Sequence, residues 1–197
     1  MSTPTGNTDP YVYPGTSVLK NLRGIRDSSV LSRFEMDMTS RRLAQLAQSE
    51  LSGLFDASRL RTIHACIFQD VYPWAGDYRT VSISLPGVTF AFHEFIATSL
   101  DQVFDALSDR LWAREPDLRR FAMNGAFLMG EINAVHPFRD GNGRAQREFI
   151  RQLAVHHGHS LNWSRVSMQQ MYEASSLSFR RQDYSGLEEI IYSAISE

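Results

Sequence analysis

The sequence predicts an all-helical domain that carries one β-hairpin. Nearly every segment places its apolar residues at the i, i+3, i+4, i+7 spacing of one helix face. A period of two occurs only in the stretch from Tyr78 to Phe92, where Pro86 and Gly87 supply a turn. Because a lone two-stranded hairpin is only marginally stable in water, we expect this one to lie against the helices.

The first 27 residues are expected to form an extended arm. They are rich in Pro, Gly, Asn and Thr, and the aromatic side chains of Tyr11 and Tyr13 would attach the arm to the body. Residues 28–197 are expected to form a single domain, because a chain of about 200 residues can bury a core without support from disulfides or metals.

The rest of the domain reads as a succession of helices. Ser28 or Ser29 is expected to cap the first of them, and Gly158 to end the fifth. His64 lies on the apolar stripe of the second helix, where we expect a hydrogen-bonded core histidine rather than a metal ligand. The predicted helices are Val30–Gln48, Ser58–Val71, Glu94–Trp112, Asp117–Val135, Arg144–His157, Ser167–Ser178 and Ser185–Ser196.

Composition and charge narrow the class of protein. The net charge of −2 argues against a general nucleic-acid binder, because phosphate backbones are normally met by an excess of Lys and Arg. The single cysteine excludes an intramolecular disulfide and a Cys-rich zinc site. The N-terminus lacks the pattern of a secretory signal, and no apolar stretch approaches the ~20 residues of a membrane span. We therefore expect a cytoplasmic protein that binds neither membranes nor, directly, nucleic acid.

The run HPFRDGNGRAQR, residues 136–147, concentrates the residue types of a phosphate site. Pro137 disfavours helical geometry at His136, and the glycines permit the close approach of a ligand. A glycine turn that leads into a helix points free N–H groups and the positive end of the helix dipole at an anion. Arg144 and Arg147 follow three residues apart, and their guanidinium groups fit phosphate oxygens bidentately.

Two further side chains of this run suggest catalysis. Asp140 would repel a phosphate on its own, but it suits a divalent cation that bridges phosphates, as Mg²⁺ commonly does. His136 can accept a proton at neutral pH. The residue types alone leave a purely structural interpretation open, in which a glycine turn joins two core helices and carries surface arginines and a capping Asp.

The whole run resembles the signature of Fic domains, H-x-F-x-[D/E]-G-N-G-R-x-x-R, and it fills every specified position. The stretch LRTIHACIFQDVYPWAGDYR, the hairpin after it and the helix that ends in EINAVHPF also resemble Fic cores. The resemblance covers roughly residues 60–163 and implies a helical bundle with a hairpin flap beside the active site. It also implies an enzyme that transfers AMP from ATP to a Tyr, Ser or Thr hydroxyl of a target protein and releases pyrophosphate.

The resemblance implies a role for each matching residue. His136 would be the base that deprotonates the target hydroxyl, and Asp140 would hold Mg²⁺ against the α- and β-phosphates. Arg144 would contact the β- and γ-phosphates, and Arg147 would hold the γ-phosphate so that the α-phosphorus is oriented for in-line attack. Phe138 would anchor the loop in the core. The anion hole would be lined by Gly141, Asn142 and Gly143.

The resemblance also implies that the hairpin docks the target, by adding the target segment to its edge through backbone hydrogen bonds. Main-chain docking carries little sequence information, so no residue here identifies the target. Some bacterial toxins of this family and size modify type II topoisomerases, which makes DNA gyrase and topoisomerase IV candidates. The expected flap comprises Thr80, Val81, Ser82, Ile83, Ser84, Leu85, Pro86, Gly87, Val88, Thr89 and Phe90.

Members of this family are commonly restrained by a helix with the motif [S/T]-x-x-x-E-[G/N], whose Glu pairs with the second motif arginine, here Arg147. Two partial matches, Ser185–Glu189 and Ser193–Glu197, lack the final Gly or Asn. We therefore expect the inhibitory helix to belong to a separate small antitoxin, which would make this chain the toxin of a bacterial toxin–antitoxin pair. Self-inhibition through Glu197 is the alternative.

Two other functions stay open at this point. The enzyme could transfer UMP, phosphocholine or a phosphate instead of AMP, although the intact G-N-G-R favours the usual orientation of the nucleotide. The domain could also be a non-catalytic nucleotide-binding interaction module. The presence of both His136 and Asp140 argues against that reading, because a pure binder does not need the base.

Overall fold

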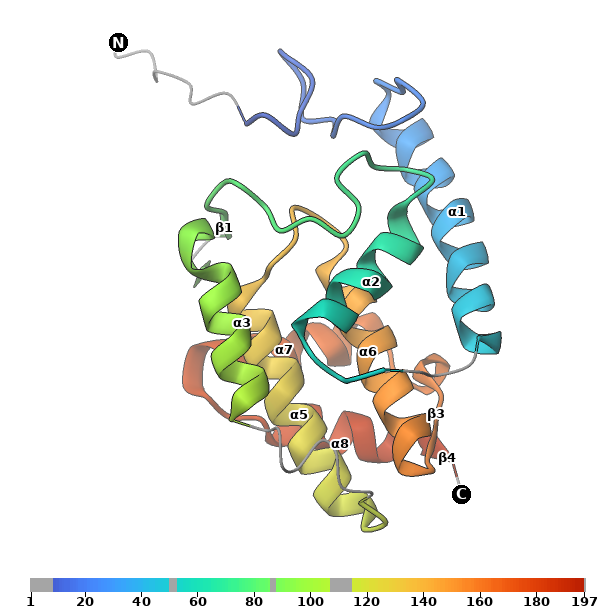
Figure 1. The fold of residues 1–197 in the computed structure, drawn as a ribbon, viewed down its shortest axis with the longest axis vertical. Coiled ribbons are helices and arrows are strands. Elements are labelled where there is room, and N and C mark those ends of the chain that lie inside the picture. The colour runs from blue at the N-terminus through green and yellow to red at the C-terminus, as the bar shows by residue number, and fades with distance from the viewer. Residues whose placement is uncertain (1–8, 50–52, 86–87, 107–114, 197) are drawn as a thin grey trace.

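A computed structural model describes residues 9–49, 53–85, 88–106 and 115–196 of the chain. Figure 1 shows a helical bundle in which α5 and α6 run through the middle, α2 and α1 stack on one side, and α3, α7 and α8 pack around the other. The elements are α1 (Ser28–Gln48), α2 (Ala57–Phe68), β1 (Ser84–Leu85), β2 (Val88–Thr89), the 3-10 turn η1 (His93–Phe95), α3 (Ile96–Asp105), α5 (Leu118–Val135), α6 (Asn142–His157), β3 (Ser160–Leu161), η2 (Trp163–Arg165), α7 (Met168–Arg181), α8 (Ser185–Ala194) and β4 (Ile195–Ser196).

The core is built around α5, which packs against α3, α6, α7 and α8. Small residues allow this close packing: a Cβ added at Gly125 would lie 3.3 Å from Cδ1 of Ile191 in α8, and one added at Gly130 would overlap the ring of Tyr184. None of the described helices is long and apolar enough to cross a membrane. The bundle therefore places the C-terminal end of α5 and the N-terminal end of α6 side by side, joined by the short loop of residues 136–141.

The predicted helices are present with shifted ends. Asp27, rather than Ser28 or Ser29, caps α1, because its carboxylate accepts a hydrogen bond from the Val30 N–H at 2.9 Å. Helix α2 ends at Phe68, earlier than predicted, since Tyr72 precedes a proline and cannot easily stay helical. Helix α3 is described from Ile96 to Asp105. The predicted end of the helix Glu94–Trp112 lies outside the described residues.

In the last third of the chain one predicted helix end is confirmed and another is wrong. Gly158 ends α6 with a φ of 89°, as predicted. The last helix, however, stops at Ala194, and β4 then pairs antiparallel with β3, with Ser160 opposite Ser196. Strands of two residues are too short to show a period of two, so the sequence pattern could not reveal this pairing.

The predicted long hairpin is wrong for most of its length. Regular pairing is limited to Ser84 opposite Thr89 and Leu85 opposite Val88, and the predicted turn residues Pro86 and Gly87 lie outside the described residues. Below this short ladder the two arms are joined by the buried guanidinium of Arg79, which donates to the carbonyls of Val81 at 2.7 Å and Ala91 at 2.6 Å. A side chain thus replaces the backbone ladder that the alternating pattern predicted.

The N-terminal arm packs on the body through Tyr11. Its ring contacts Trp74 edge-on with centroids 5.5 Å apart, and its hydroxyl accepts a hydrogen bond from the Thr80 N–H at 3.0 Å. Tyr13 is also partly buried against the hydrophobic core, and its ring lies under the guanidinium of Arg26. Both tyrosines therefore pack as predicted, and Tyr11 makes the contacts with Trp74 and Thr80 of the body.

Candidate active site

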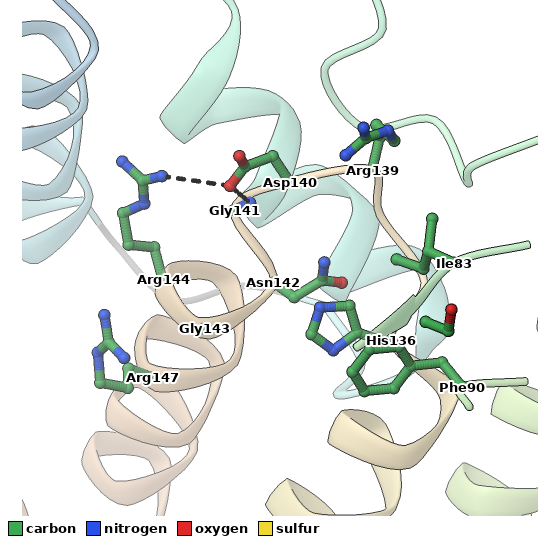
Figure 2. Close-up of a pocket in the computed structure, with 11 residues that line it drawn as sticks. Ile83, Phe90, His136, Arg139, Asp140, Gly141, Asn142, Gly143, Arg144 and Arg147 are labelled. Carbon is green, nitrogen blue, oxygen red and sulfur yellow. Dashed lines mark hydrogen bonds and ion pairs between the residues drawn. The ribbon is translucent and has the colours of Figure 1, made fainter. Parts of the chain in front are cut away.

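A cavity of about 480 Å³ opens where α5 ends and α6 begins, a size typical of small-ligand sites. Figure 2 shows the loop, the first turns of α6 and the flap arranged around it. Phe138 points away from the cavity into the core, where it is only 1% exposed. The other residues predicted from the motif all line the cavity, together with Arg139 and three flap residues: His136, Asp140, Gly141, Asn142, Gly143, Arg144, Arg147, Ile83, Ser84 and Phe90.

His136 ends α5 in a left-handed backbone conformation. Its φ is 51°, and its N–H still bonds to the Ile132 carbonyl at 2.9 Å. Residues with a Cβ adopt this conformation at an energetic cost, which the surrounding structure must offset. The imidazole leaves the helix and stacks on Phe90 of the flap with ring centroids 4.0 Å apart. The flap and the histidine are therefore in direct contact.

The environment keeps the His136 imidazole neutral. Burial lowers the pKa of His136 to about 4, with a further lowering from the positive charge of Arg79, while the carbonyl of Asn133 acts in the opposite direction. At neutral pH the ring is thus in the state that can accept a proton.

His64 of α2 holds the motif loop from beneath. Its Nδ1 accepts a hydrogen bond from the Gly76 N–H at 2.9 Å, so the ring proton is assigned to Nε2, which donates to the Asp140 carbonyl at 2.9 Å. The ring stacks on Phe138 at 3.8 Å and on Phe68 at 4.6 Å. Burial lowers the pKa of His64 to about 4, so the ring stays neutral. The prediction of a core histidine is confirmed, and its role is to position the loop.

Asn142 and the glycines set the shape of the loop. The Asn142 side chain accepts from the Phe138 N–H at 2.9 Å and donates to the Phe138 carbonyl at 2.8 Å, so it closes the loop and is itself buried. Gly141 has a φ of 81°, and a Cβ there would overlap the Phe68 ring. A Cβ at Gly143 would lie 3.2 Å from Nη1 of Arg147. The backbone N–H groups that open α6 consequently border the cavity without side chains in front of them.

The two arginines that line the cavity differ in their ion pairing within the described part of the chain. Arg144 donates from Nη2 to the Glu35 carboxylate at 2.5 Å and from Nη1 to Thr39 Oγ1 at 3.4 Å. Arg147 forms no ion pair within the described part of the chain, and burial, with the charge of Arg144, lowers its pKa. In Figure 2 both side chains rise from α6 on the same side. Two cations in one partly buried pocket favour an anionic ligand.

Asp140 is placed where a cation would stabilise it. Burial raises the pKa of Asp140, and the charge of Glu35 raises it further. Its Oδ1 lies 3.7 Å from Nη2 of Arg144. The described residues contain no group of three or more His, Cys, Asp or Glu side chains that could hold a metal by themselves. This donor set fits Mg²⁺, which is commonly held by one or two carboxylates together with substrate phosphates.

Sequence reasoning missed Arg79, which joins the flap to the histidine. The side chain is only 2% exposed and donates to the carbonyls of His136 at 2.8 Å and Val135 at 3.1 Å, in addition to those of Val81 and Ala91 in the flap. Carbonyls at the C-terminal end of α5 carry the negative end of the helix dipole, so they compensate the buried cation. The only sequence signal was a charged residue at the start of an apolar alternating stretch.

For the AMP transfer from ATP that the Fic resemblance implies, replacing Arg79 with lysine is expected to lower the rate about a hundredfold while changing the affinity for ATP less than twofold. A lysine keeps the charge but cannot reach four carbonyls, so His136 and the flap lose their common support. Steady-state transfer rates and calorimetric ATP titrations measure the two effects. Arg61→Lys is the matched control, because Arg61 donates to the Gly76 carbonyl outside the cavity. A parallel loss of ATP affinity and rate would show general unfolding instead.

Comparison with known proteins assigns the chain to a family. The model of the Fic/DOC family matches residues 54–154. The chain is 40% identical over 174 residues to the protein adenylyltransferase VbhT of Bartonella schoenbuchensis, a match that covers 88% of the chain and 36% of VbhT. It is 35% identical over 172 residues to the probable protein adenylyltransferase y4lH of Sinorhizobium fredii, covering 87% of the chain and 88% of that protein. The chain belongs to the Fic/DOC family.

The fold supports the same assignment. The crystal structure of BepC, a VirB-translocated effector protein of Bartonella tribocorum with bound AMPPNP, superposes with a TM-score of 0.89 at 25% sequence identity, covering 94% of this chain and 96% of that one. The chain spans about a third of the length of VbhT and most of the length of y4lH. The family match of residues 54–154 includes the motif loop, α2 and the flap, and it does not include α1.

Proposed function

We propose that this Fic domain transfers AMP from ATP to a hydroxyl side chain of a target protein and releases pyrophosphate. The observation that carries the proposal is one cavity in which a neutral His136, two arginines and the start of a helix converge. The AMPPNP bound to BepC, an ATP analogue in a relative with the same fold, supports ATP as the ligand.

Each side chain then has a role in the reaction. The phosphates would lie at the start of α6 against Gly141, Asn142 and Gly143, with Arg144 and Arg147 on the β- and γ-phosphates. Asp140 would hold Mg²⁺, which supplies neutralisation of the phosphate charge. His136 takes the proton from the Tyr, Ser or Thr hydroxyl, whose oxygen then bonds to the α-phosphorus. The bond from that phosphorus to the bridging oxygen breaks, and pyrophosphate leaves.

The flap is proposed to dock the target. Ile83, Ser84 and Phe90 already line the cavity, so a segment added to the edge of the flap would run past His136. DNA gyrase and topoisomerase IV are the first targets to test, on the strength of the family resemblance alone.

A separate antitoxin is proposed to restrain the enzyme. Of the two partial inhibitory motifs, the first uses Glu189, whose carboxylate pairs with Arg119 at 2.5 Å. The second ends at Glu197, which lies outside the described residues. Its neighbour Ser196 pairs with Ser160, just beyond the C-terminal end of α6, whereas Arg147 lies in the second turn of that helix. The ion pair that already engages Glu189, and the missing Gly or Asn after both partial motifs, favour an inhibitory glutamate supplied in trans.

Labelling from ATP tests the proposal. The isolated chain is incubated with Mg²⁺, bacterial lysate or purified gyrase, and ATP labelled on either the α- or the γ-phosphorus. Label from α-phosphorus with the wild type, and none with His136→Ala, is the expected result. Label from the γ-phosphorus would indicate phosphate transfer, and no label from ATP, UTP or a phosphocholine donor would indicate a binding module. If the isolated chain became active only after Glu197 was removed, that result would contradict the proposal that a separate antitoxin restrains the enzyme.

A further inference from the structure

The N-terminal helix α1 reaches the cavity through a polar stripe. Glu35, Thr39, Arg42 and Leu46 follow one another at spacings of four, three and four residues, which places them on one face of the helix. This face is bonded to the body along its length, by Glu35 to Tyr72 and Arg144, by Thr39 to Arg144, by Arg42 to Asp70, and by the Leu46 carbonyl to Arg151. A helix outside the matched family segment is thus fastened directly to the first motif arginine.

Both carboxylate oxygens of Glu35 are occupied by donors of the body. Oε2 accepts a short hydrogen bond from the Tyr72 hydroxyl, and Oε1 lies 2.5 Å from Nη2 of Arg144. Burial raises the pKa of Tyr72, and the carboxylate of Glu35 raises it further, so the hydroxyl keeps its proton and donates. Charge-assisted hydrogen bonds of this kind are strong and fix geometry.

Glu35 lies behind Arg144 and does not take the place of a phosphate. Arg144 lines the cavity, whereas Glu35 does not. The guanidinium is held by Glu35, by Thr39 Oγ1 and by the face of the Phe68 ring, 4.6 Å from the ring centroid. Figure 2 shows Arg144 extended toward the blue ribbon of α1, away from His136. A carboxylate that competed with the ligand would have to line the cavity itself.

We infer that Glu35 is a positioning residue that fixes the Arg144 guanidinium in the geometry that binds the terminal phosphates of ATP. The inference rests on the proposed function, in which ATP occupies this cavity. An unsupported arginine samples many rotamers, and ordering it opposes binding. Glu35 orders the Arg144 side chain before ATP binds, through a contact made by α1. Binding of ATP therefore does not have to offset the loss of rotamer entropy of this arginine.

Nucleotide binding tests the inference in a His136→Ala parent, which cannot turn ATP over in the proposed reaction. Glu35→Gln removes the charge, whereas Glu35→Asp keeps the charge but is too short to span Tyr72 and Arg144. Both are expected to weaken the calorimetric affinity for ATP·Mg²⁺ and ADP·Mg²⁺ about tenfold and to leave that for AMP within twofold. Asp37→Asn, which removes the same charge from an exposed site on α1, is the matched control and should bind like the parent.

A double-mutant cycle shows whether Glu35 acts through Arg144. In an Arg144→Met background, Glu35→Gln is expected to have no further effect on ATP affinity. If Glu35→Gln bound ATP more tightly, Glu35 would be a competitor of the phosphates. If Glu35→Asp bound ATP like the parent, the charge of Glu35 would matter and its contact geometry would not. Either result overturns the inference. Equal weakening for AMP would show a general structural role and overturn it as well. A parent that binds no ATP at all contradicts the proposed function itself.

Discussion

Replacing His136 with alanine is expected to lower the rate of AMP transfer about a thousandfold. The imidazole is neutral in its buried position and stands in contact with the flap, where the target hydroxyl would arrive. No other described histidine lines the cavity, so water or hydroxide would have to remove the proton in its place. Single-turnover transfer to a purified target measures the effect.

The same variant is expected to bind ATP as the wild type does. The phosphates would be held by the start of α6 and by Arg144 and Arg147, which the substitution does not touch. His159→Ala serves as control, because His159 bonds to the Glu115 carbonyl beyond the far end of α6. A His136→Ala enzyme that keeps a tenth or more of the wild-type rate would exclude this histidine as the base.

The free energy of unfolding is expected to fall steeply as the pH drops from 6.5 to 4. His64 and His136 have pKa values near 4 in the folded chain, against an ordinary value of 6.5. The unfolded chain therefore binds protons first, so the stability that these residues contribute is complete above pH 6.5 and is lost toward pH 4. Each contributes roughly 3 kcal/mol. Asp140 acts in the opposite direction, because its folded pKa is raised.

Urea unfolding at several pH values measures this loss. His136→Ala removes one of these two contributions, so the part of the decline from pH 6.5 to 4 that the two rings cause should be about half as steep as in the wild type. His64→Phe should keep the aromatic stack but lose the hydrogen bonds to the Asp140 carbonyl and from the Gly76 N–H, and it should be less stable than the wild type already at pH 7. A stability that stays flat from pH 7 to 4.5 would show that the two rings are not kept neutral by burial.

Most helices could be predicted from the sequence because their signals are local. Apolar spacing, an N-terminal Asp and a C-terminal Gly act within one or two turns, as the cap of Asp117 on α5 and the end of α6 at Gly158 illustrate. The prediction of a long hairpin was wrong because the alternation of apolar residues reflects side chains such as Ile83 and Phe90 that face the cavity. It does not reflect a continuous ladder of backbone hydrogen bonds. The pairing of β3 with β4 could not be predicted because a strand of two residues is too short to show an alternating apolar pattern.

The motif residues could be gathered into one site from the sequence because they are contiguous: a loop between two helices must bring His136, Asp140 and the two arginines near one another. That is a local consequence of chain connectivity and helix geometry. The groups that support this site come from far along the chain, namely Glu35 of α1, His64 of α2 and Arg79 before the flap. Their partners are backbone carbonyls and a carboxylate brought close by helix packing, which no spacing within one segment encodes. The sequence by itself thus determined which residues meet the nucleotide, and the tertiary structure decided how each is held, because buried polar groups must find partners wherever the packed helices place them.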